Sequence, residues 1–214
     1  MRTLDTPENF GFLIPSAAIV IGESIGNYRM TAKLGEGGMG AVYLGEHQFI
    51  ERRAAIKVLL PELSANKDIV QRFFNEARAT SVIHYPGIVE ITDCAVLATG
   101  NAYIVMELLE GESLGNYLRG GTRLSVQRSA HLTRHIADAL AAAHDKHIVH
   151  RDLKPDNIFV LSAKDAPSPI KILDFGIVKL LNTDAAQGQK TRAGNIIGTP
   201  GLHVARAVPR QGRG

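Results

Sequence analysis

The sequence predicts an α+β fold, in which a β-rich part with one helix precedes a helical part with short strands. Up to residue 108 the chain has five apolar runs of strand length and one stretch with helical spacing. After residue 110 it has its longest helical pattern, followed by runs of only two to four apolar residues. A length of 214 residues, 45% of them hydrophobic, suits one domain or two small lobes around one cleft.

The predicted strands of the first part are 28–34, 41–44, 54–60, 88–98 and 102–108. Apolar and polar residues alternate over 28–34, a glycine-rich turn follows, and Pro61 ends the third strand. The helix of this part is predicted over 67–83 because apolar residues recur at helical spacing. Its apolar face is Ile69, Phe73, Ala77 and Thr80.

The second part begins with a predicted helix over 125–146. Its apolar face is Leu132, Ile136, Ala139, Leu140 and Ala143. Short apolar strands are predicted at 148–149, 158–161 and 170–173. His131 and His135 lie four residues apart on this helix, a spacing that can bind a metal, but no third ligand is apparent and a surface or packing role is favoured.

Composition restricts the class of protein. The single cysteine, Cys94, excludes an intrachain disulfide and fits a cytoplasmic location. The apolar segment 10–22 is too short to span a bilayer, is interrupted by Pro15, and lacks the positive start of a signal peptide. Residues 1–25 are therefore expected to form a loosely ordered leader, and no membrane segment is predicted.

The first motif with chemical content is Gly35-Glu-Gly37-Gly-Met-Gly40. Glycines let backbone N–H groups approach phosphate oxygens without interference from a Cβ. A dinucleotide-binding turn would need a helix after it, whereas here a strand follows. Taken alone, the motif is also compatible with a plain hairpin turn.

The second motif is Lys57, inside the apolar strand Ala54-Ala-Ile-Lys-Val. A lysine there is costly unless its ammonium meets anions, such as phosphates and a carboxylate. Glu76, on the predicted helix 67–83, is a candidate partner. A lysine that extends its head to the surface is the alternative.

Two polar motifs follow short strands of the second part. His150-Arg-Asp152-Leu-Lys154-Pro-Asp-Asn157 offers a proton acceptor in Asp152, a cation in Lys154 and a neutral oxygen ligand for Mg²⁺ in Asn157. Asp174-Phe-Gly176 places a second possible Mg²⁺ ligand at a strand end. A solvated charged loop is the plain alternative for the longer motif.

In this order and on these elements, the four motifs match the protein-kinase signature. The chain resembles serine/threonine protein kinases of the bacterial, eukaryotic-like type over about 26–200. The resemblance implies a bilobal kinase fold with a complete β-rich N-lobe, 26–109, and a partial C-lobe, 110–200. It also implies transfer of the γ-phosphate of Mg-ATP to Ser or Thr hydroxyls of proteins.

The same resemblance implies roles for individual residues. Asp152 is the base, Lys154 offsets charge on the phosphoryl group, and Lys57 contacts phosphates and pairs with Glu76. Asn157 and Asp174 hold Mg²⁺. The ATP-binding set is Leu34, Gly35, Gly37, Gly40, Val42, Ala55, Lys57, Met106, Glu107 and Leu109. Thr191 and Thr183 are candidate activation-loop phosphosites that would pair with Arg151, and Thr199 resembles a threonine that bonds near the catalytic Asp.

The family pattern fails after Gly201. Residues 202–214 hold no acidic residue and three arginines, and the family's A-P-E or S-P-E motif is missing. One back-translation of 201–212, read one base later, encodes Gly-Tyr-Met-Ser-Pro-Glu, the expected continuation. We therefore hypothesise one extra base near codon 201 and an aberrant basic tail over 201–214; a genuine basic tail is the alternative.

The missing continuation bears on activity. The C-lobe is expected to be incomplete, so the chain as written is expected to bind ATP weakly or not at all and to show little kinase activity. The alternative function is an inactive nucleotide-binding fragment or pseudokinase-like regulatory module. The glycine-rich motif and Asp-Leu-Lys-Pro argue against a small-molecule phosphotransferase. Nucleic-acid binding through the tail is not expected.

Overall fold

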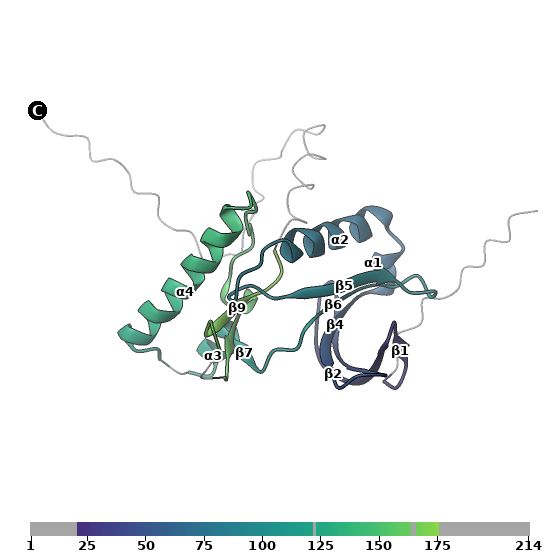
Figure 1. Cartoon of the computed structure of the whole chain (residues 1–214), viewed down its shortest axis with the longest axis horizontal. Helices are drawn as coiled ribbons and strands as arrows, with labels where there is room; N and C mark the ends of the chain where they lie inside the picture. Colours follow the sequence, from purple (N-terminus) through teal and green to yellow (C-terminus); the bar gives the residue numbers. More distant parts are fainter. Residues whose placement is uncertain (1–20, 122, 164–165, 176–214) are drawn as a thin grey trace, which may run out of the picture. The chain divides into compact units, whose positions relative to one another are not determined.

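The computed structural model describes residues 21–121, 123–163 and 166–175. All of them belong to one compact unit of the chain. They form a six-stranded sheet, a three-stranded sheet and the helices that pack beside them (Figure 1). The α+β class predicted from the sequence is confirmed.

The six-stranded sheet has the order β1-β2-β3-β4-β6-β5, and all its pairs are antiparallel. The strands are β1, Ser24–Ile25; β2, Tyr28–Gly37; β3, Gly40–His47; β4, Arg53–Leu59; β5, Ile91–Val96; and β6, Ala102–Glu107. β1 lies within the predicted leader, and its Ile25 is buried in the core of the sheet. The ordered fold therefore begins before residue 26.

Alternate side chains of the sheet enter two separate cores. Ala54, Ile56 and Val58 of β4 pack on one face with Met30 and Val105. The other face holds Leu59 and Ile104, which pack with Phe73 and Ala77 of helix α2, Lys67–Ser81. This division follows from the two-residue period of a strand. The short helix α1, Pro61–Ser64, joins β4 to α2.

Helix α2 begins where the side chain of Asn66 accepts hydrogen bonds from two amides of the first turn, Asp68 N and Ile69 N. Its buried residues are Phe73, Ala77 and Thr80, which confirms most of the predicted face. The helix runs beside β5 (Figure 1). This packing fixes which side chains of α2 face the sheet.

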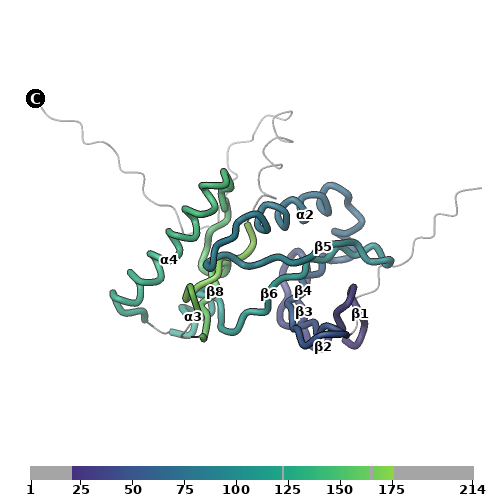
Figure 2. The backbone as a smooth tube through the Cα atoms, viewed as in Figure 1, coloured from purple at the N-terminus to yellow at the C-terminus, as the bar shows by residue number. Residues whose placement is uncertain are grey.

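The second part consists of β7, Gly111–Ser113; α3, Leu114–Arg119; α4, Val126–His144; the 3₁₀ turn η1, Pro155–Asn157; β8, Ile158–Leu161; and β9, Ile170–Ile172. The three strands form an antiparallel sheet in the order β7-β8-β9. Leu132, Ala139 and Ala143 of α4 are buried in the core under this sheet, and the helix packs against β9 (Figure 2). The side chain of Ser125 caps α4 by accepting a hydrogen bond from Arg128 N.

The segment between α2 and β5 is shared by both parts. Ile88 pairs with Ile172 of β9 in a parallel bridge. The amide of Val89 donates to the Ile172 carbonyl at 3.1 Å, and the amide of Ile172 donates to the Gly87 carbonyl at 2.8 Å. These bonds place the residues that follow β9 close to α2 and β4.

The structure corrects one predicted element. Residues 148–149 form no strand; Ile148 packs against the core of the second part, and its amide donates to the carbonyl of Ala143 at the end of α4. Only β8 therefore flanks the His150–Asn157 motif as a strand. Among the described residues, none of the helices combines the length and the apolar composition that spanning a membrane requires.

Candidate active site

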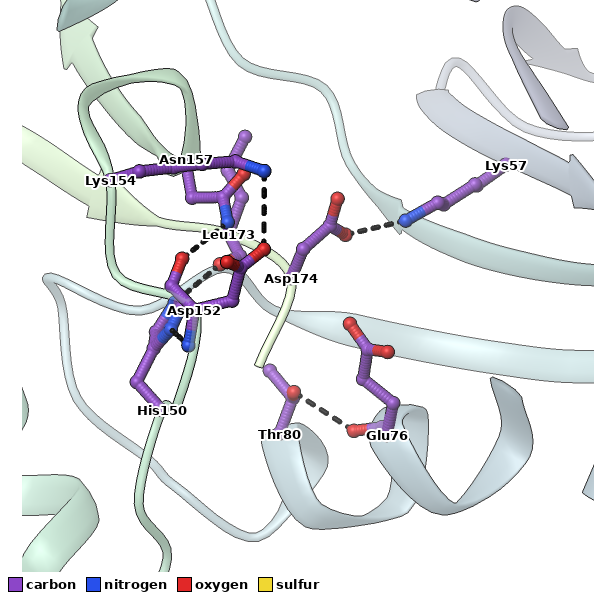
Figure 3. Close-up of polar contacts among 9 residues, drawn as sticks. All are labelled: Lys57, Glu76, Thr80, His150, Asp152, Lys154, Asn157, Leu173 and Asp174. Carbon is purple, nitrogen blue, oxygen red and sulfur yellow. Dashed lines mark hydrogen bonds and ion pairs between the residues drawn. The ribbon is translucent and has the colours of Figure 1, made fainter. Parts of the chain in front are cut away.

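Polar side chains from four segments meet in one region (Figure 3). Lys57 comes from β4, Glu76 from α2, and Asp174 from the residues after β9. Asp152, Lys154 and Asn157 come from the segment between α4 and β8. The structure thus brings together residues that the sequence predicted as catalytic or metal-binding.

Lys57 pairs with Asp174, not with Glu76. Its Nζ lies 2.6 Å from Asp174 Oδ1, and no ion pair of Glu76 is found within the described residues. Burial raises the pKa of Glu76 to about 8, helped by the negative charges of Asp174 and Asp152 and opposed by Lys57. A glutamic acid that is mostly protonated at neutral pH offers Lys57 no charge. The expected Lys57–Glu76 pair is not formed in this structure, in which Lys57 is paired with Asp174.

His150 is a buried support for the loop that carries Asp152. Asp152 N donates to His150 Nδ1 at 3.3 Å, which makes Nε2 the protonated nitrogen, and Nε2 donates to the Leu173 carbonyl at 2.9 Å. Burial lowers the pKa of His150, so the ring stays neutral. Its ring lies 4.7 Å from that of Phe175, which is fully buried. This histidine fixes the loop and the segment around Asp174 relative to each other.

The Asp152 carboxylate is one-fifth exposed and faces a cation. Lys154 Nζ lies 3.1 Å from Asp152 Oδ2, and the side-chain exposed fractions are 33% and 19%. Arg151, just before it, has a φ of +63° and is exposed. A partly exposed carboxylate beside a lysine can accept a hydroxyl proton while the lysine balances nearby negative charge.

The residues predicted to hold a divalent metal have suitable donors. The amide nitrogen of Asn157 donates to the Asp152 carbonyl at 2.9 Å, which leaves the amide oxygen for a cation. Asp174 supplies a half-exposed carboxylate. Mg²⁺ binds through one or two such oxygens plus phosphates of the substrate. The donor set fits this ion.

The glycine-rich motif is the hairpin between β2 and β3, with Gly37 opposite Gly40. The three glycines differ in their surroundings. A Cβ on Gly40 would lie 2.0 Å from the Val58 carbonyl oxygen, whereas a Cβ on Gly35 or Gly37 would meet nothing within 4 Å. Gly40 is therefore required for strand packing, and the first two glycines leave open space where phosphates could approach.

Part of the predicted adenine-contacting set lies around the end of β6. Ala55 of β4 is opposite Met106, and Leu109 lies in the link to β7. Leu34, at the start of the glycine-rich motif, is half exposed. A pocket of about 340 Å³ is lined by Arg52, Arg53, Ala54, Met106, Glu107, Leu108 and Glu110. It borders the predicted adenine-contacting link but includes no residue of the glycine-rich motif.

Two polar residues near the site were not predicted. Lys171, in β9, bonds to Glu107 and to the Ile88 carbonyl. Arg119, in α3, pairs with Asp156 at 2.7 Å. The signal for Lys171 was present in the sequence, because a lysine inside an apolar strand needs an anionic partner just as Lys57 does.

Several predictions concern residues outside those described. These are the phosphosites Thr183 and Thr191, Thr199, Gly176 and the tail 201–214. Within the described part, no group of three His, Cys, Asp or Glu side chains could hold a metal ion. His131 is exposed and makes an edge-to-face ring contact at 4.7 Å with the partly buried His135, in agreement with the surface or packing role favoured for them.

Comparisons with known proteins identify the family to which a chain with this site belongs. The model of the protein kinase domain family matches residues 28–202. The chain belongs to the protein kinase family. It is 44% identical over 181 residues to the serine/threonine-protein kinase Pkn1 of Myxococcus xanthus, covering 85% of this chain and 25% of Pkn1. Over 214 residues, all of this kinase chain, it is 34% identical to pkn3 of the same organism, of which it covers 37%.

Solved structures show the same fold. The kinase domain of Mycobacterium tuberculosis PknI matches with a TM-score of 0.62 and 29% sequence identity, covering 75% of this kinase chain and 62% of that domain. Both curated relatives are named as serine/threonine kinases. This chain is therefore a bacterial-type serine/threonine kinase by family, and it spans only about a quarter to two-fifths of these relatives' length.

Proposed function

We propose that the protein transfers the γ-phosphoryl group of ATP to Ser or Thr hydroxyls of protein substrates. The observation that carries the proposal is the convergence of Lys57, Asp174, Asp152 and Lys154 in one region, drawn from three separate motifs of the sequence (Figure 3). Positioning and electrostatic stabilisation are the main contributions that a kinase makes to this reaction.

Each residue has a part in the proposed reaction. Asp152 accepts the proton of the attacking hydroxyl, and Lys154 offsets charge on the transferred group. Lys57 moves from Asp174 to the phosphates, which frees the Asp174 carboxylate for a metal ion. Asn157 and Asp174 would hold Mg²⁺, which neutralises charge between the phosphates.

The sequence around the catalytic loop supports serine and threonine as acceptors. Asp-Leu-Lys154-Pro is the form typical of kinases that act on these residues, and the relatives' names agree with it. A reducing, cytoplasmic location belongs to the same proposal, because the chain has a single cysteine.

The test is phosphate transfer from radiolabelled ATP to a generic Ser/Thr protein substrate. Whatever transfer the 214-residue chain shows, even at a low rate, should disappear in Asp152→Asn. Asp145→Asn is the matched control, because Asp145 is an exposed aspartate at the end of α4, outside the site. Transfer that survives Asp152→Asn would refute the role of this carboxylate.

A second function, nucleotide binding without transfer, is favoured by one observation. Lys57 is held by Asp174 and makes no ion pair with Glu76, whereas phosphate transfer by protein kinases requires the lysine–glutamate pair. Titration with ATP separates the two functions. ATP binding by a folded chain that transfers no phosphate would support a regulatory module, and transfer would exclude it.

A further inference from the structure

Glu107 is the point where three segments of the chain are bonded together. It ends β6 and opens the link 107–110, which carries the predicted adenine contacts. Its amide donates to the Glu90 carbonyl at 3.0 Å. Its carboxylate oxygen Oε1 accepts two further hydrogen bonds, from Glu90 N at 2.7 Å and from Lys171 Nζ at 2.5 Å.

Lys171 completes the connection from the side of β9. Its Nζ also donates to the Ile88 carbonyl at 3.2 Å. The lysine therefore joins the link 107–110 to the segment 87–90 and to β9, whose own backbone is paired with Ile88. Asp174, the predicted metal ligand, follows Lys171 by three residues.

The Glu107–Lys171 ion pair is more buried than the other ion pair of the link, Arg53–Glu110. The side chains of Lys171 and Glu107 are 15% and 27% exposed. Arg53 and Glu110, which also join the link to the sheet, are 57% and 75% exposed and lie 3.5 Å apart. An exposed pair of this kind contributes little, whereas a shielded, charge-assisted hydrogen bond holds its partners in one geometry.

We propose that Glu107 and Lys171 are positioning residues that couple the adenine-contacting link to the metal ligand Asp174. The pair connects the link with Asp174, since Glu107 is itself in the link and Lys171 is in the strand that leads to Asp174. A shift of β9 that carries Asp174 out of place must stretch the bond to Glu107, and a shift of the link must do the same. The nucleotide part of this inference rests on the proposed function.

The first test is amide hydrogen exchange of the full chain without nucleotide. Lys171→Met and Glu107→Gln should each speed exchange about tenfold in both 104–110 and 169–175, as expected for a lost charge-assisted hydrogen bond. Lys171→Arg keeps the charge and the donors and should restore slow exchange in both segments. Arg53→Met is the control, with no effect in 169–175. Faster exchange confined to the segment that carries each substitution would overturn the coupling.

The second test is ATP affinity with and without Mg²⁺. In the wild-type chain Mg²⁺ should strengthen ATP binding, and this gain should fall several-fold in Lys171→Met and return in Lys171→Arg. A merely structural role would lower the melting temperature and leave the gain from Mg²⁺ unchanged, which would overturn the nucleotide part. A wild-type chain that binds no ATP would refute the proposed function, while the exchange measurements still decide the coupling.

Discussion

Replacing Glu76 by Gln should change how the stability of the kinase depends on pH. The pKa of Glu76 is raised from 4.5 to about 8, with burial as the largest cause. The unfolded chain releases this proton near pH 4.5, whereas the folded chain keeps it until about pH 8. The stability that the protonated side chain contributes is therefore complete below pH 4.5 and is lost as pH rises toward 8. Over that window the wild-type chain should lose up to about 5 kcal/mol of unfolding free energy, because the loss is about 1.4 kcal/mol for each pH unit between the unfolded and folded pKa values.

The glutamine variant lacks this titration. Glu76→Gln keeps the shape of the side chain and stays neutral at every pH, so its stability relative to wild type should rise by about 1.4 kcal/mol per pH unit between about pH 5 and 7.5. At the alkaline end the variant should be the more stable protein. The effect is large because the charge is near Asp174 and Asp152 as well as buried.

The assay is urea unfolding followed by far-ultraviolet circular dichroism, since the chain contains no tryptophan. Glu62→Gln, at an exposed position of α1, controls for the loss of one negative charge. A difference between Glu76→Gln and wild type that stays constant from about pH 5 to 7.5 would refute the reasoning. It would mean that Glu76 is equally charged in the folded and unfolded chains.

Three further predictions concern the glycines and the tail. Gly40→Ala places a Cβ 2.0 Å from the Val58 carbonyl oxygen, so it should cost about 1–3 kcal/mol of stability. Gly37→Ala should leave the melting temperature unchanged and weaken ATP binding; equal melting temperatures for the two variants would contradict this. Gly115→Ala would bring a Cβ within 2.3 Å of Asp156 Oδ1, the end of a side chain that can turn away, so it should cost less than Gly40→Ala; Gly120→Ala, with contacts no closer than 3.5 Å, should leave stability unchanged. Resequencing of codons 195–214 should reveal one extra base near codon 201; the frame as given would exclude the frameshift. The family match ends at residue 202, while the similarity to pkn3 runs over the whole chain, so this measurement decides between an aberrant and a genuine tail.

The sequence predicted most of the regular structure because long apolar patterns are little affected by their surroundings. The helix expected over 67–83 is α2, Lys67–Ser81, and the helix expected over 125–146 is α4, Val126–His144. β8 has the predicted bounds, Ile158–Leu161. Short elements such as β1 and β7 were missed, because two or three residues are too few to show a period and form strands only through their partners.

For the site, the sequence predicted which residues meet but not how they are paired. The motifs identify Lys57, Glu76 and Asp174 through residue type and order. The choice of Asp174 over Glu76 as the partner of Lys57 depends on how β4, α2 and the residues after β9 are placed, which no local pattern reports. The Glu107–Lys171 pair likewise depends on how distant segments are placed, although Lys171 itself could have been noticed.

The parallel bridge between Ile88 and Ile172 has a consequence for the order in which the chain folds. Every strand of the six-stranded sheet has been synthesised by residue 107, and all its pairs except β4–β6 join strands that follow one another in the sequence. The carbonyl of Gly87 and the amide of Val89 find their partner only when Ile172 has left the ribosome. Contacts between residues so distant in sequence form slowly. The six-stranded sheet should therefore fold during synthesis, before β9 is available. Docking of β9 is then the late step that completes the site.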